Sequence, residues 1–278
     1  MAVIFIVREI YMRKVLLATT ALVALNVSAA SADISISGSA TFEIEDQSSG
    51  TDYSSDGNVV IKATNTTDSG LKLMAVQDTK FEDSTIADSY IDISGDFGSI
   101  RMGNTDNALD RMDGALPENM DLESTGDSSV SGAIGGDETG ISFMSPSFSG
   151  ITVYGSTTAE GATTGVGANY KAGGVEVMFQ SGSGDETALA GKFSAGAVTV
   201  QVGAVNVGSG SSKTEYRQVG ASYTMGDVKL IATQQKQGDN KYTNVGAKYT
   251  VAPGLTVAAE SGSQDSVNST WVQVAVKF

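Results

Sequence analysis

The sequence ISISGSATFEIE, residues 34–45, changes polarity at every step. Apolar or small residues occupy its even positions, and polar residues occupy its odd positions. The even set is Ile34, Ile36, Gly38, Ala40, Phe42 and Ile44, and the odd set is Ser35, Ser37, Ser39, Thr41, Glu43 and Glu45. Alternation with a period of two predicts a β-strand that has one apolar face and one polar face.

The same alternation recurs along the chain, for example in residues 198–204, 245–251 and 272–278, while helical spacing is essentially absent. The pattern therefore predicts an all-β chain. Residues 105–139 fit no strand and form a long acidic connection, which indicates either a functional loop or a wrong strand assignment. Turn residues divide the rest into sixteen expected strands, at 34–46, 57–67, 70–80, 86–95, 98–104, 140–146, 150–160, 164–172, 174–182, 186–195, 197–207, 213–225, 227–237, 240–251, 254–263 and 269–278.

The N-terminal region has the pattern of an export signal. A basic Met12–Lys14 precedes the apolar run Val15–Val27, and the small residues Ala30–Ala32 follow. This order predicts a secretory signal peptide over residues 12–32, with cleavage before Asp33, because the apolar run is too short to span a bilayer. A buried N-terminal helix is the alternative. Residues 1–11 do not fit the signal pattern, and we interpret them as an over-extended N-terminus.

Composition excludes several classes of function. The chain has 278 residues, no Cys, no His and a net charge of −15. Disulfides, thiolate zinc sites and histidine-based catalysis are therefore excluded. The portion from residue 33 onward keeps 14 of the 17 basic and 31 of the 32 acidic residues, a net charge of −17. Such an acidic chain is poorly suited to nucleic acid.

Aromatic residues recur beside the turns of the second half. Tyr170, Phe193, Tyr223 and Tyr249 each precede a Gly-containing turn, and an aliphatic strand follows. A membrane-interface girdle requires aromatics at such a fixed height, although a core layer of a soluble sandwich is the alternative. The polar face is too rich in Ser, Thr, Gln, Gly, Lys and Glu for a packed core. A closed barrel in lipid with a water-filled lumen satisfies both faces.

Two motifs flank the long connection: GDFGSIRMGNTDNA at residues 95–108 and SFMSPSFSG at residues 142–150. The first resembles the strand-turn-strand that leads into the inward-folded third loop of general diffusion porins of Gram-negative outer membranes. The second resembles the Y-x-S-P-x-F-x-G motif by which porins return from that loop. The closest resemblance is to the short alphaproteobacterial, Rhodobacter-like porins, and it covers essentially all of residues 33–278.

The resemblance implies a single porin domain over residues 33–278. This domain would be a transmembrane antiparallel β-barrel of about sixteen strands, with fourteen as the alternative because the chain is short. It further implies a homotrimer in the outer membrane that passes small hydrophilic solutes and ions by passive diffusion. Phe278, with Val272, Val274 and Val276 before it, resembles the signal that the barrel assembly machinery reads. Trp271 falls on the inward parity, whereas the family usually places its last-strand aromatic outward.

The resemblance also places a constriction in residues 105–139, where the loop would fold into the lumen. The expected acidic residues of this constriction are Asp106, Asp110, Asp113, Glu118, Asp121 and Glu123, with Asp127 beyond them. Lys62, Lys72 and Arg101 occupy the polar parity of earlier strands and are the expected basic wall opposite the loop. Opposed charges would create a transverse field, and the acidic excess favours cations. A solvated surface loop and ordinary lumen charges are the alternatives.

Two other classes of protein share features with this sequence. Outer-membrane enzymes share this architecture, but they use a His, which this chain lacks. An acidic β-rich adhesin or structural protein without channel activity remains the alternative; a calcium-repeat version would need tandem repeats, and only Gly135–Asp137 resembles one. We therefore expect no catalysis and no cofactor, with adventitious Ca²⁺ binding by the acidic loops as the one open metal question.

Overall fold

The structure is a computed structural model that describes residues 32–81, 85–106, 137–158, 164–208, 210, 213–265 and 267–278. The expected N-terminal extension and nearly all of the expected signal peptide lie outside these residues, as does most of the 105–139 connection. No helix among the described residues is long and apolar enough to cross a membrane.

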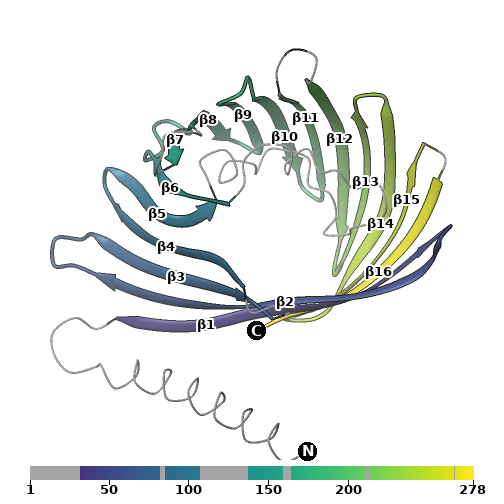
Figure 1. Cartoon of the computed structure of the whole chain (residues 1–278), viewed down its shortest axis with the longest axis horizontal. Coiled ribbons are helices and arrows are strands. Elements are labelled where there is room, and N and C mark those ends of the chain that lie inside the picture. The colour runs from purple at the N-terminus through teal and green to yellow at the C-terminus, as the bar shows by residue number, and fades with distance from the viewer. Residues whose placement is uncertain are drawn as a thin grey trace, which may run out of the picture.

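Sixteen strands form one closed antiparallel barrel, in which each strand pairs with its neighbours in the chain and β1 pairs with β16 (Figure 1). This confirms the all-β prediction and the count of sixteen, so the alternative of fourteen is wrong. The strands are β1 Asp33–Gln47, β2 Gly50–Thr66, β3 Lys72–Lys80, β4 Ile86–Gly95, β5 Gly98–Asp106, β6 Asp137–Met144, β7 Ile151–Thr158, β8 Thr164–Ala172, β9 Val175–Gly182, β10 Thr187–Ala195, β11 Val198–Val207, β12 Thr214–Met225, β13 Val228–Gln237, β14 Asn240–Ala252, β15 Leu255–Gln264 and β16 Val267–Lys277.

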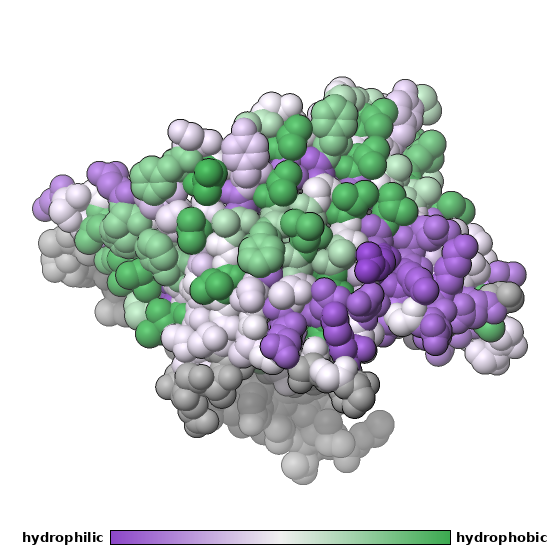
Figure 2. Space-filling model, turned by 90° about the horizontal axis from the view of Figure 1, so that it is seen from above, coloured by the Kyte–Doolittle hydropathy of each residue, from purple (hydrophilic) through white to green (hydrophobic). Residues whose placement is uncertain are grey.

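The apolar face of the barrel points outward. Along β16, Val272, Val274 and Val276 are 37–42% exposed, whereas Trp271 and Gln273, on the opposite parity, are 1% and 6% exposed. Figure 2 shows hydrophobic residues gathered over a broad area of one outer side of the barrel. An apolar exterior around a closed ladder is the arrangement that lipid requires, because no backbone group is left unpaired at an edge.

The two ends of the barrel differ. At one end the strands are joined by tight turns, and Gly173, Gly196 and Gly226 adopt positive φ there, which glycine allows without strain. The chain also closes at this end, where Gly38 and Phe278 exchange two backbone hydrogen bonds of 2.9 and 3.0 Å. In outer-membrane barrels short turns face the periplasm and longer loops face the exterior. We call these the short-turn end and the long-loop end.

The aromatics beside the short turns lie on the outer surface. Tyr170, Phe193, Tyr223 and Tyr249 are 43–52% exposed and alternate with inward-facing residues of their strands. The girdle interpretation is therefore confirmed, and the core-layer alternative is wrong. Aromatic rings at this height are suited to the boundary between lipid tails and headgroups.

Candidate functional site

The register of the ladder identifies the residues that line the lumen. Starting from Trp271 and Gln273, direct cross-strand partners on successive strands share the inward face. Among the described side chains the basic members of this face are Lys62, Lys72, Lys80, Arg101, Lys171, Lys192, Lys229, Lys248 and Lys277. The acidic members are Asp33, Glu43, Glu45, Asp52, Asp56, Asp78, Asp92, Glu176 and Glu260. The wall is therefore nearly balanced in charge, although the chain is strongly acidic.

The three cations proposed for the pore wall all occupy inward positions. Lys62 pairs with Ser35, Lys72 with Ser94, and Arg101 with Asp92. Their neighbours Ile61, Leu73 and Ile100 take the outward parity, as the alternation predicts. The position of the three cations is thus established, and their role in a constriction stays a prediction.

Arg101 is tied to its own sheet. Its Nε lies 3.4 Å from Oδ2 of Asp92, which is only 7% exposed, and its guanidinium lies 4.0 Å from the centre of the Tyr90 ring. Sequence reasoning missed Asp92. The signal was available, because Asp92 lies on the polar parity of residues 86–95 and the tight turn at residues 96–97 brings it opposite Arg101. The ion pair fixes the Arg101 side chain against the wall.

The acidic residues expected in the constriction lie almost wholly outside the described part of the chain. Asp106 is the last residue of β5 and pairs with Asp137 of β6. The others, Asp110, Asp113, Glu118, Asp121 and Glu123, fall outside the described residues. The candidate constriction is therefore described only on its wall side.

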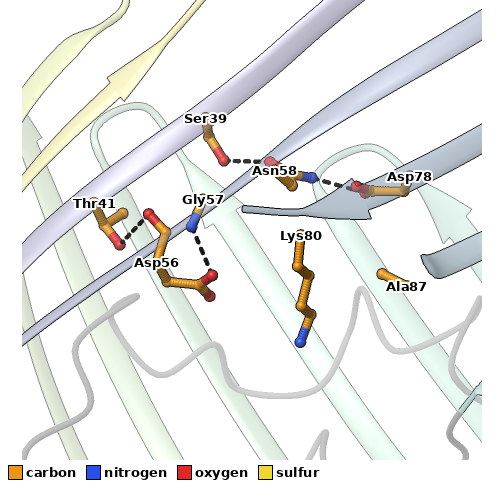
Figure 3. A pocket seen from close by; sticks show the side chains of 8 residues that line it. All are labelled: Ser39, Thr41, Asp56, Gly57, Asn58, Asp78, Lys80 and Ala87. Carbon is orange, nitrogen blue, oxygen red and sulfur yellow. Dashed lines mark hydrogen bonds between the residues drawn. The ribbon is translucent and has the colours of Figure 1, made fainter. Parts of the chain in front are cut away.

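A polar recess of about 250 Å³ lies in the wall of β1–β4 (Figure 3). It is lined by Ser39, Thr41, Asp56, Gly57, Asn58, Asp78, Lys80 and Ala87. Ser39 Oγ donates to Asn58 Oδ1, and Asn58 Nδ2 donates to Asp78 Oδ2, each at 2.7 Å. This chain of bonds fixes the carboxylate of Asp78 on the wall of the recess. The recess was not predicted, because its residues become neighbours only through the register of four strands.

The chemistry of the described lumen is that of binding and screening ions. Carboxylates, ammonium groups, amides and hydroxyls line it, and no group of acidic side chains among the described residues is arranged to hold a metal ion. Fixed charges of both signs in a low-dielectric wall orient dipolar solutes and favour hydrated ions over apolar molecules.

Part of the inward face is buried and apolar, which the sequence analysis did not expect. Met178 and Val205 are fully buried together with Ala188 and Ala190, and Tyr154, Val207 and Tyr216 pack against them. Trp271 is 1% exposed and contacts Ala258 and Ile231. The polar-lumen prediction is therefore incomplete, because apolar residues such as Met178, Val205 and Trp271 are buried at inward positions beside the polar ones.

Comparison with known proteins gives one family and one fold. A family model described as Gram-negative porin matches residues 18–278. A mutant of the Rhodobacter blastica porin is 18% identical, with a TM-score of 0.71 over 88% of this chain and 100% of that chain. The trimer form of OmpT from Vibrio cholerae is 13% identical, with a TM-score of 0.73 over 89% of this chain and 100% of that chain. No curated protein matches the sequence.

Proposed function

The chain belongs to the Gram-negative porin family, which makes it an outer-membrane channel protein, and we propose that this channel passes small hydrophilic solutes passively and prefers cations. The observation that carries the proposal is the closed barrel with an apolar outer face and a charged, largely polar inner face. A sixteen-strand barrel is wide enough to hold an aqueous channel. Such a wall binds and orients solutes, and it offers no arrangement suited to bond chemistry.

The cation preference must come from the connection between β5 and β6. The described wall carries nearly equal numbers of basic and acidic side chains, so the wall alone gives little net selectivity. The connection, by contrast, carries Asp110, Asp113 and Glu118 without a basic residue other than Arg111 between residues 105 and 139. Fixed carboxylates at a narrow point raise the local concentration of cations.

We propose in addition that the connection between β5 and β6, residues 107–136, folds into the lumen and faces Lys62, Lys72 and Arg101; the ends of the expected 105–139 segment belong instead to these two strands. Two observations support this placement. The connection leaves β5 only a few residues after Arg101, at the long-loop end. The inward side chains of Met178, Val205 and Trp271 are buried, which is unexpected for an open, water-filled lumen and calls for a covering segment.

We also propose that the barrel forms a homotrimer. OmpT, one of the matched structures, is described as a trimer. On this chain, an apolar groove of about 450 Å³ on the outer face of β2–β5 is lined by small residues such as Ala63 and Ala75, which suits close contact with a second copy. The mass of the protein solubilised in a mild detergent measures this assembly.

Planar-bilayer conductance in a salt gradient tests the channel proposal. The wild-type protein should conduct and give a reversal potential of the sign for cation preference. The triple variant Asp110→Asn, Asp113→Asn, Glu118→Gln should shift the reversal potential markedly toward zero, because it removes fixed negative charge at the constriction. Lys62→Gln with Arg101→Gln should shift it the opposite way.

Two results would contradict these proposals. If the folded protein shows no conductance, the protein is a structural or adhesive barrel and the channel function is wrong. If both sets of variants conduct with wild-type reversal potentials, the acidic connection lies outside the pore.

A further inference from the structure

Basic side chains of the lumen gather at the short-turn end. Lys171, Lys192, Lys229 and Lys248 lie on β8, β10, β13 and β14. Lys277, Lys62 and Lys72 continue the series on β16, β2 and β3. Each of these seven lysines lies no more than four residues from the end of its strand at the short turns or at the chain terminus. Together they place positive charge on seven strands of the short-turn half of the lumen.

The acidic side chains of the lumen gather toward the opposite end. Glu43 and Glu45 lie near the long-loop end of β1, and Asp56, Asp78 and Glu260 lie in the corresponding parts of β2, β3 and β15. Among the described inward side chains, Lys80 is the one cation in this half of the barrel. The nearly balanced charge of the wall is therefore separated along the axis.

Among the described inward side chains, the carboxylates of the basic half are fewer than its cations. Asp92 is paired with Arg101, and Glu176 lies 3.5 Å from Lys171, while Asp33 is the first residue of β1. Asp68, Asp96 and Asp227 lie on the short turns, exposed to water at the rim, where screening is strongest. Lys229 and Lys248 lie directly opposite each other in the ladder, which places two positive charges side by side on the wall of this mouth.

We propose that the lumen is electrically bipolar along its axis, with an anion-attracting vestibule at the short-turn end and a cation-attracting half toward the long loops. The proposal rests on the channel function above and adds a substrate class, small anions that enter from the short-turn side. When the long-loop compartment is positive, cations enter through the acidic half and anions through the basic half. Both ions then accumulate inside the channel. The reverse polarity draws both ions out, so the channel rectifies.

The wild-type test is the current–voltage relation of single channels of known orientation. Because the chain has no Cys, Asp227→Cys in the β12–β13 turn reports orientation through an impermeant thiol reagent added to one compartment. In 0.1 M KCl the current should be about 1.5-fold or more larger when the long-loop side is positive than at the reverse polarity. In 1 M KCl, where the Debye length falls to about 3 Å, the two currents should become equal.

A matched pair of variants separates the lumen from the outer surface. Lys229→Gln with Lys248→Gln removes the inward like-charge pair and should reduce rectification in 0.1 M KCl. Lys236→Gln with Lys241→Gln removes a like-charge pair from the same two strands that faces outward, and it should leave rectification unchanged. Equal effects of the two double variants would overturn the proposal.

Chemical modification of a cysteine after the channel has assembled changes the charge of the lumen without affecting folding. Lys248→Cys treated with a cationic thiol reagent should recover the wild-type rectification, and treatment with an anionic reagent of similar size should lower it further. If oriented wild-type channels conduct but give symmetric currents in 0.1 M KCl, or rectify with the opposite sign, the bipolar lumen is wrong while the channel function stands. If no conductance is seen at all, it is the channel function that is wrong.

Discussion

Gly38 of β1 leaves room for the side chain of the C-terminal residue, Phe278. A Cβ added at Gly38 would meet the backbone oxygen of Asn58 and would lie 2.9 Å from Cζ of Phe278. The Gly38→Ala variant should therefore force the C-terminus or β2 to shift where the barrel closes, at a cost of about 1–3 kcal/mol. The measurement is the urea midpoint of the folded barrel in detergent, which should fall.

Gly191 of β10 provides the control. It also faces outward on a strand, but a Cβ there would meet only Cγ2 of Val202 at 3.7 Å, an ordinary contact. Gly191→Ala should leave the midpoint essentially unchanged. Equal urea midpoints for Gly38→Ala and the wild type would show that the packing of Phe278 does not require a glycine at residue 38.

Single residues also show how far the candidate site was predictable. Alternation alone placed Lys62, Lys72 and Arg101 on the inward face, because parity within a strand is a local property. Asp92 as the partner of Arg101, and the recess between Asp56, Asp78 and Lys80, depend on which residues become cross-strand neighbours. That information resides in the register, which one strand does not specify by itself.

Strand β2 shows the corresponding limit for elements. Sequence reasoning began it at residue 57, whereas it begins at Gly50. Residues 50–56 are polar and turn-like, and they form a strand because β1 extends beside them. Tyr53 stacks on Phe42 with ring centroids 6.4 Å apart, and Ser54 donates to Glu43 at 3.2 Å. Most other boundaries were predicted within two residues, because tight turns and clear alternation mark them.

A prediction about the last strand distinguishes recognition of Phe278 by the assembly machinery from packing of Phe278 in the folded barrel. Val272, Val274, Val276 and Phe278 face outward, and Phe278 is 64% exposed. If the assembly machinery reads this strand end, Phe278→Ala should lower the amount of barrel inserted in cells several-fold. The same variant should fold into detergent micelles in vitro with a yield much closer to that of the wild type.

Phe193→Ala is the matched control for this prediction. It removes an outward aromatic that is 52% exposed, beside a short turn of the same barrel end. Insertion in cells should be nearly normal for this variant. Equal losses in cells and in micelles for Phe278→Ala would assign Phe278 a packing role only.

At the scale of the whole molecule, closure of the sheet makes the charge of the lumen wall differ from the net charge of the chain. The net charge of −17 from residue 33 onward led us to expect a lumen that favours cations, yet the described lumen wall is nearly neutral, with its cations and carboxylates gathered toward opposite ends. Alternation predicts which residues share a face, but the height of each charge follows from sixteen registers taken together. The sequence therefore predicted the barrel and its inner face, and it missed the separation of charge.

The fluorescence of Trp271, the single tryptophan, can test whether a segment of the chain fills the lumen. Trp271 faces inward between Glu45 and Glu260, contacts Ala258 and Ile231, and is 1% exposed. If residues 105–139 cover this wall, replacing residues 107–136 by a short Gly-Ser link should expose the indole to lumen water. Its emission should shift to longer wavelength and become accessible to iodide, while single-channel conductance rises because the lumen is wider. A link of the same composition replacing residues 159–163 is the control, and it should leave the emission unchanged. Wild-type emission and conductance after removal of 107–136 would mean that the wall around Trp271 is closed by the barrel itself and that the connection lies outside the lumen.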